Sequence, residues 1–149
     1  IEDMGTPDIT SQKKVALSTK FKSISIDSDA KIFASARSGL SPVIFYQFAQ
    51  LIKMPDKSLA NLLHVSPRTI SNYQEKHKSL DPVQSEHLLK LIALYDKGEE
   101  IFGNIDEFNY WLNKPLWGST EKPIDWLITP GGAGLVMLEI DRLAYGYPA

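Results

Sequence analysis

Cysteine is absent from this 149-residue chain, which excludes disulfides and thiolate metal sites and makes a reducing cytoplasm its natural setting. No apolar run approaches the ~18 residues that a membrane span requires, so we expect no membrane partner. No charged segment followed by an apolar one opens the chain, so the sequence gives no sign of an export leader. The 43% hydrophobic and 10% aromatic content is typical of a folded protein.

Patterns that carry catalysis or bind metal are also missing. The three histidines are His64, His77 and His87, and none pairs with another at metal-ligand spacing on one helix face. His87 beside Glu86 is most simply a solvated or packing residue. Residues 131–134 read Gly-Gly-Ala-Gly but lack the preceding strand and the lysine of a phosphate loop, so they indicate a helix start that needs close packing. We expect a non-enzyme with no catalytic residue, no cofactor and no metal.

Helix signals recur along the whole chain and predict an all-α fold. Ser41-Pro42, Asp81-Pro82 and Thr129-Pro130 each supply an N-cap followed by a first-turn proline. Ser23–Asp27 alternates like a short strand, but five residues are weak evidence. The expected helices cover Asp29–Ser38, Pro42 to about Lys53, Ser58–His64, Pro67–Gln74, Pro82 to about Phe102, a short helix capped by Asp106, a turn at Pro123–Leu127, and a last helix from Thr129-Pro130.

Apolar residues recur at helical spacing within these segments. The residues that share one face of their helix are Ile32, Phe33 and Ala36; Ile44, Phe45, Phe48, Leu51 and Ile52; Leu88, Leu91, Ile92 and Tyr95; and Leu135, Leu138 and Leu143. The short helix carries Phe108, Trp111 and Leu112, and Trp126 is expected to point inward.

Residues 59–73 read LANLLHVSPRTISNY, the layout of a DNA-binding helix-turn-helix. The leucines face the core, and Ala60 is small where the second helix crosses closely. His64 falls where the turn needs a positive φ, a position that glycine usually takes and that histidine tolerates better than most residues. Val65 and Ile70 anchor the second helix to the first.

The outward side of the second helix is the candidate DNA-binding surface. Ser66 is also placed to cap this helix. Arginine can read guanine and asparagine can read adenine, while hydroxyl groups mainly reach phosphates. The candidate residues are Ser66, Arg68, Thr69, Asn72, Tyr73 and Lys76, with Lys78 as a further backbone contact. An ordinary helical hairpin with a solvated polar face is the simpler alternative, but the combined spacing in residues 59–73 is rarer than that.

Charge is distributed unevenly along the chain. Residues 53–90 hold six basic and four acidic residues, whereas residues 91–149 hold four and nine. This small positive excess is weak for a DNA-binding protein, because affinity grows with the number of phosphates that are neutralised. A homodimer would double that number, so we expect a dimer if operator DNA is the target.

Several ordered motifs fill the second half of the chain. Residues 80–94 read LDPVQSEHLLKLIAL, residues 101–115 read IFGNIDEFNYWLNKP, and residues 123–127 read PIDWL. With the final helix and tail at 131–149 and the segment 38–55 upstream, these motifs make residues 30–149 resemble the Xre/MbcA/ParS-type toxin-binding antitoxins. The chain departs from the family at Pro130-Gly131-Gly132, where charged or helix-favouring residues are more usual.

The resemblance implies an N-terminal Cro/repressor-like helix-turn-helix domain that represses the operon, followed by a small helical toxin-binding domain. It also implies a RES-domain toxin that consumes NAD, and an antitoxin C-terminus that enters the toxin's active-site cleft. Here that end is Tyr145, Gly146, Tyr147, Pro148 and Ala149. The expected division is an arm at 1–28, a DNA-binding region at 29–80 and a toxin-binding domain at 81–149.

Two other functions fit the same residues. One is a stand-alone dimeric helix-turn-helix regulator whose acidic C-terminal domain senses a ligand or dimerises. The other is an interaction adaptor whose helix-turn-helix has lost its affinity for DNA. The tail itself is uncharged and holds two tyrosines and a proline, which suits a stiff apolar probe, although a frayed terminus has the same composition.

Overall fold

The structure, a computed structural model, describes residues 26, 28–116 and 118–146, and its elements over these residues are all helices. They are α3 (Asp29–Ser38), α4 (Pro42–Leu51), α5 (Asp56–Leu62), α6 (Pro67–Glu75), α7 (Pro82–Phe102), α8 (Ile105–Leu112), the 3₁₀ helix η1 (Pro123–Ile128) and α9 (Pro130–Tyr145). The all-α prediction is confirmed. The strand expected at 23–27 and the arm expected at 1–28 lie almost wholly outside the described residues.

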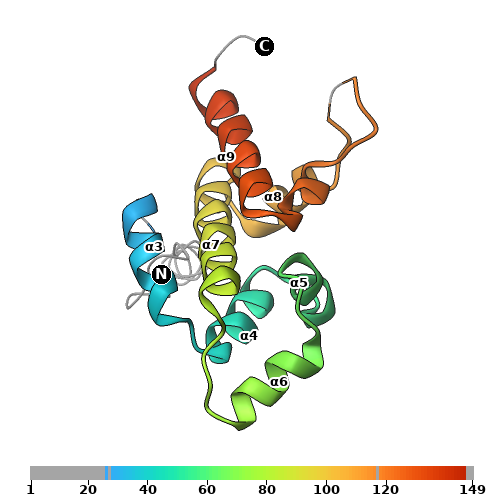
Figure 1. Cartoon of the computed structure of the whole chain (residues 1–149). Coiled ribbons are helices and arrows are strands. Elements are labelled where there is room, and N and C mark those ends of the chain that lie inside the picture. Colours follow the sequence, from blue (N-terminus) through green and yellow to red (C-terminus); the bar gives the residue numbers. More distant parts are fainter. Residues whose placement is uncertain (1–25, 27, 117, 147–149) are drawn as a thin grey trace, which may run out of the picture.

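The long helix α7 runs through the middle of the molecule, with α3 on one side and α9 on the other (Figure 1). Helices α4, α5 and α6 gather at the end where α7 begins. Leu88, Leu91, Ile92 and Tyr95 are fully buried, as predicted. The ring of Tyr95 meets the rings of Phe48 and Phe108 edge-on, with centroids 5.5 and 5.1 Å away. One aromatic cluster therefore joins α4, α7 and α8.

Most helix ends follow the predicted caps. The side chains of Ser41, Ser66, Asp81 and Thr129 each accept a hydrogen bond from a backbone N–H of the first turn. The cap predicted at Asp106 is wrong. Asn104 caps α8 instead, because its Oδ1 accepts from the backbone N–H of Glu107 at 2.8 Å.

Asp106 lies within the first turn of α8, where a negative charge is favourable. Its carboxylate accepts two hydrogen bonds from Lys53 Nζ, at 2.8 and 3.0 Å. This exposed ion pair connects the end of α4 with the start of α8.

Two of the predicted apolar faces differ from the structure. Phe33 does not join Ile32 and Ala36 in the core, because its side chain is 57% exposed. The leucines of α9 share a face, but that face is turned outward. The helix instead buries Ala133, Val136 and Ile140, the first two being small.

The first turn of α9 has room only for a small residue at Gly132, because the chain before the helix lies very close. A Cβ atom added to Gly132 would collide with the backbone carbonyl of Trp126. Trp126 is only half-buried, and its indole N–H donates to Glu121 at 3.2 Å. The expectation that the glycines at this helix start serve close packing is therefore confirmed for Gly132.

Gly98, in the last turns of α7, marks a second close approach. A Cβ atom there would overlap the ring of Phe108, so α7 and α8 touch at this point. Gly134, inside α9, has open space around the corresponding position. None of the described helices is long and apolar enough to cross a membrane.

These two glycines give a matched test of the packing. Gly98→Ala gains about 1 kcal/mol of helix propensity, but we expect overpacking against Phe108 to cost about 1–3 kcal/mol and leave the protein less stable. Gly134→Ala gains the same propensity with no collision and should raise stability. Urea denaturation of both variants measures this, and equal shifts of the two midpoints would contradict the close α7–α8 contact.

Candidate functional site

The turn between α5 and α6 has the predicted geometry. His64 adopts φ 59°, the left-handed conformation expected at this position. The backbone N–H of Val65 donates to the carbonyl of Ala60 at 3.1 Å, which closes the end of α5. Leu59, Ala60 and Ile70 are fully buried, so α6 is fixed against α5 and α4.

The outer side of α6 presents three of the candidate residues together. Arg68, Asn72 and Lys76 are exposed and follow one another at intervals of four, which places them on one helix face. Arg68 lies in the first turn of α6, where a recognition helix contacts base edges, and the amide of Asn72 lies one turn further along the same face.

The other candidates have partners inside the protein. The Ser66 hydroxyl accepts from the backbone N–H of Thr69 at 3.0 Å, and the two hydroxyls lie 2.8 Å apart. Tyr73 is half-buried, and the ammonium of Lys78 lies 5.5 Å from its ring centroid. These side chains make contacts that stabilise α6 itself.

Glu75 is a residue of this face that the sequence analysis missed. It is exposed and lies three residues after Asn72, so its carboxylate shares the face with Arg68. The sequence already placed Glu75 on this face, because it lies seven residues, or about two helical turns, after Arg68. A carboxylate here repels phosphates and can accept a hydrogen bond from a cytosine amino group. The net positive charge of the α6 face is therefore lower than its lysines and arginine suggest.

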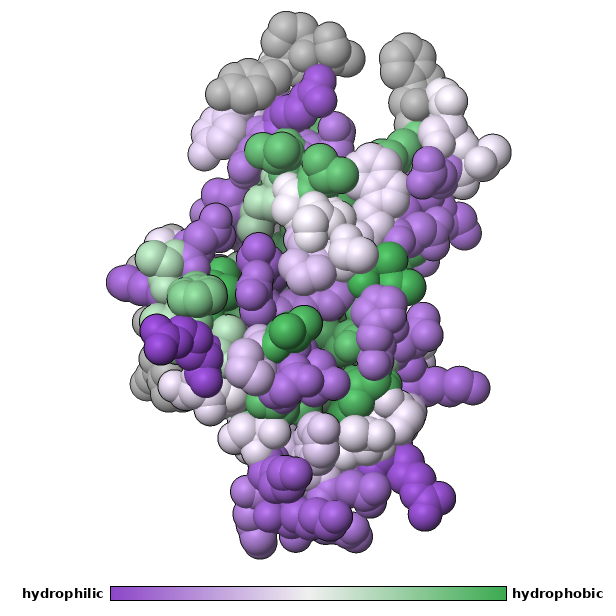
Figure 2. Space-filling view, in the orientation of Figure 1, coloured by the Kyte–Doolittle hydropathy of each residue, from purple (hydrophilic) through white to green (hydrophobic). Residues whose placement is uncertain are grey.

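Figure 2 shows that the surface around α6 is almost entirely hydrophilic, whereas hydrophobic side chains appear at the opposite end, over α9. On α9, Leu135, Leu138 and Leu143 are 53%, 59% and 54% exposed. An Arg142–Glu139 ion pair with an N–O distance of 3.2 Å lies on the same outward side. The two ends of the molecule are thus chemically distinct.

The predicted toxin-binding tail begins at the end of α9. Tyr145 is 65% exposed, and Gly146 ends the helix at φ 66°, with its N–H donating to the carbonyl of Arg142. The structure places Tyr145 and Gly146 next to the outward leucines of α9. Tyr147, Pro148 and Ala149 lie outside the described residues.

Two family models match the chain, one on each side of residue 95. The antitoxin Xre-like helix-turn-helix domain matches residues 33–93, and the antitoxin Xre/MbcA/ParS C-terminal toxin-binding domain matches residues 97–146. The chain belongs to the Xre/MbcA/ParS antitoxin family. No curated protein matches it.

A buried histidine of this antitoxin joins the two matched segments through a contact that the sequence did not reveal. His87, on α7, is only 3% exposed, and its Nε2–H donates to the carbonyl of Leu127 at 2.8 Å. Burial lowers the pKa of His87 below its usual value, and this outweighs the opposing effect of the hydrogen bond. The sequence left His87 as either a solvated or a packing residue, and the structure shows that it is a packing residue.

The antitoxin's other polar groups do not assemble into a metal site within the described part of the chain. Both matched families are antitoxin domains and not enzyme families. The described residues offer two candidate binding surfaces, the exposed side of α6 and the exposed side of α9.

The buried His87 predicts a pH dependence of stability. Because its pKa is lowered in the folded state, the unfolded chain takes up the proton first as the pH falls below about 6.5. The free energy of unfolding should therefore fall as the pH is lowered from about 7.5 to 5.5. His87→Gln, which keeps a hydrogen-bond donor, should remove part of this slope, and the same change at exposed His77 should not. Equal slopes in all three proteins, measured by urea denaturation, would contradict the prediction.

Proposed function

We propose that this antitoxin neutralises a RES-type, NAD-consuming toxin through its C-terminal tail and represses its own operon through α6. One observation carries the proposal. A helix-turn-helix domain and a toxin-binding domain lie in one chain. Helix α6 lies beyond the start of α7, whereas α9 runs along the side of α7 and past its end (Figure 1). Residues 29–80 would bind operator DNA, and residues 81–149 would bind the toxin. The protein would act in the cytoplasm, where its operator lies, and without enzymatic activity.

The DNA-binding part of the proposal rests on Arg68 and Asn72. Both are exposed, on the face of α6 that none of the described helices covers. Lys76 and Lys78 follow at the end of α6, where they would contact the phosphate backbone. Because the charge of one copy is small, we propose that a homodimer binds the operator.

Arg68→Ala should weaken binding to the DNA upstream of the antitoxin gene by about 1–3 kcal/mol, because it removes a contact to a base. Arg142→Ala removes the same charge from α9 and serves as the control. Electrophoretic or anisotropy titrations at two salt concentrations measure both effects. If both variants lose the same operator affinity, the effect comes from net charge alone. If the unmodified protein does not bind the operator, the protein is better explained as an interaction adaptor without affinity for DNA.

The toxin-binding part rests on the outward face of α9. Exposed apolar side chains that cluster on one element mark protein interaction sites, and Leu135, Leu138 and Leu143 lead directly to Tyr145. Tyrosine provides a large contact area at low entropic cost. We propose that the toxin covers this face and that the residues after Gly146 enter its active-site cleft. The match to a toxin-binding domain favours this function over a stand-alone regulator.

Deleting Tyr147–Ala149 should abolish neutralisation while the fold and operator binding persist. Co-expression with the neighbouring gene product, followed by measurement of cellular NAD, tests this. Arg68→Ala is the reciprocal control, because it keeps the tail and should still protect the cells. Protection by the truncated protein would exclude the tail as the inhibitory segment.

A further inference from the structure

The histidine of the helix-turn-helix turn contacts the toxin-binding domain. His64 Nε2–H donates to the carbonyl of Ile128 at 2.7 Å. His64 lies two residues before Ser66, the N-cap of α6, and Ile128 is the last residue of η1. A single hydrogen bond thus joins the start of the recognition helix to the segment that leads into α9.

The acceptor side of this bond is held in place from two directions. His87 on α7 binds the carbonyl of Leu127, one residue before Ile128. Thr129, one residue after it, caps α9 by accepting from the N–H of Gly132 at 2.9 Å. A displacement of α9 or η1 would therefore move the carbonyl of Ile128 relative to α7.

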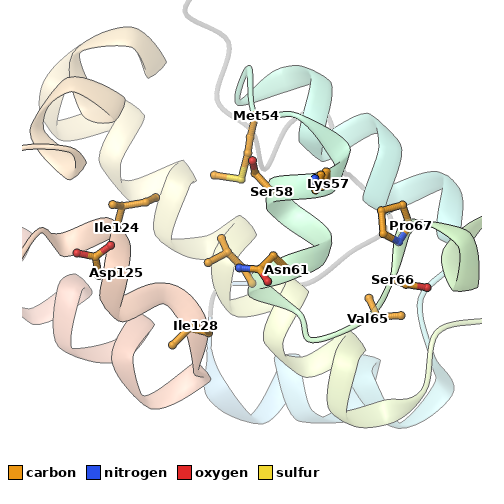
Figure 3. A pocket seen from close by; sticks show the side chains of 11 residues that line it. Met54, Lys57, Ser58, Asn61, Val65, Ser66, Pro67, Ile124, Asp125 and Ile128 are labelled. Atoms are coloured by element: carbon orange, nitrogen blue, oxygen red, sulfur yellow. The ribbon is translucent and has the colours of Figure 1, made fainter.

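An open groove of about 600 Å³ lies beside this bond, between α5 with the turn that follows it and η1. Figure 3 shows Lys57, Asn61 and Ser66 on the helix-turn-helix side and Ile124, Asp125 and Ile128 on the η1 side. A packed core would fix the distance between the two walls, and an open groove does not. Among the described residues, the hydrogen bond of His64 is the side-chain hydrogen bond that connects residues 56–79 to η1.

We propose that the His64–Ile128 hydrogen bond couples toxin binding at α9 to operator binding at α6. This inference rests on the proposed function. A toxin that holds α9 and η1 stabilises the bond, and the bond holds the turn that orients α6. Toxin binding therefore raises operator affinity, and operator binding raises toxin affinity by the same factor.

The chain offers a matched pair of variants. His64→Gly removes the imidazole and keeps the positive φ of the turn, which glycine adopts without strain. His77→Gly makes the same change at φ 55°, on an exposed histidine after α6. Any effect of the added backbone freedom appears in both variants, whereas loss of the bond to Ile128 appears in the first alone.

The first measurement is amide hydrogen exchange in the free protein, which needs neither toxin nor DNA. His64→Gly should speed exchange at Thr69 and Ile70 at the start of α6 and at Gly132 and Ala133 at the start of α9. We expect roughly 2- to 10-fold, the range that one neutral hydrogen bond supplies. His77→Gly should leave the amides of α9 unchanged. Equal exchange in His64→Gly and the unmodified protein at both sites would overturn the link.

The second measurement is the affinity for the upstream operator fragment with and without the toxin encoded by the neighbouring gene. Toxin should raise the affinity about fivefold or more in the unmodified protein and in His77→Gly, and leave it nearly unchanged in His64→Gly. A factor near one in the unmodified protein, or one that His64→Gly retains, would overturn the coupling. Failure to bind operator or toxin at all would instead overturn the proposed function, while the exchange result would still decide whether the link exists.

Discussion

The packing around α7 is the constraint on which both halves of the antitoxin depend. Its buried residues contribute about 1.5–3 kcal/mol for each large side chain removed from water, and they face α3 on one side and α8 and α9 on the other. The start of the helix is tied to the connection between α3 and α4, because Ser85 Oγ accepts from the N–H of Leu40 at 2.9 Å and the N–H of Leu80 donates to the carbonyl of Leu40 at 2.8 Å. The two matched segments divide inside α7, at residues 93–97. They therefore share one core, and we expect them to unfold together.

The elements of the fold were predictable where the determining signals are local. A polar cap followed by proline marks the start of α4, α7 and α9, and periodic apolar residues mark their length. The inward face of α9 was not predictable in this way, because it depends on how the helix packs against α7 and η1 and on the closeness of the Trp126 carbonyl to Gly132. The buried side is formed by Ala133, Val136 and Ile140. Hydrophobic periodicity alone selects the leucines, which in this helix are exposed.

The candidate binding surfaces likewise combine features that a local sequence pattern predicts with features that depend on tertiary packing. The positive φ of His64 follows from the helix-turn-helix pattern, because the turn needs it whatever surrounds it. The bond from His64 to Ile128 depends on how two segments 64 residues apart are packed, and no local pattern contains that information. It also gives a physical reason for histidine instead of glycine at this position. Glycine would serve the turn equally well but would have no side chain to reach η1.

The positions of the two surfaces bear on how the antitoxin can use them. Helix α6 lies beyond the start of α7, whereas α9 runs beside α7 and past its other end (Figure 1). A toxin bound to the outward face of α9, as we propose, would therefore leave α6 accessible. The α6 face has one arginine, Arg68, and the nearby Glu75 carboxylate offsets part of its charge. Since affinity for DNA rises with each phosphate neutralised, one such face binds weakly. The homodimer that we propose would multiply these contacts, and a toxin bound at α9 would join it without displacing the operator.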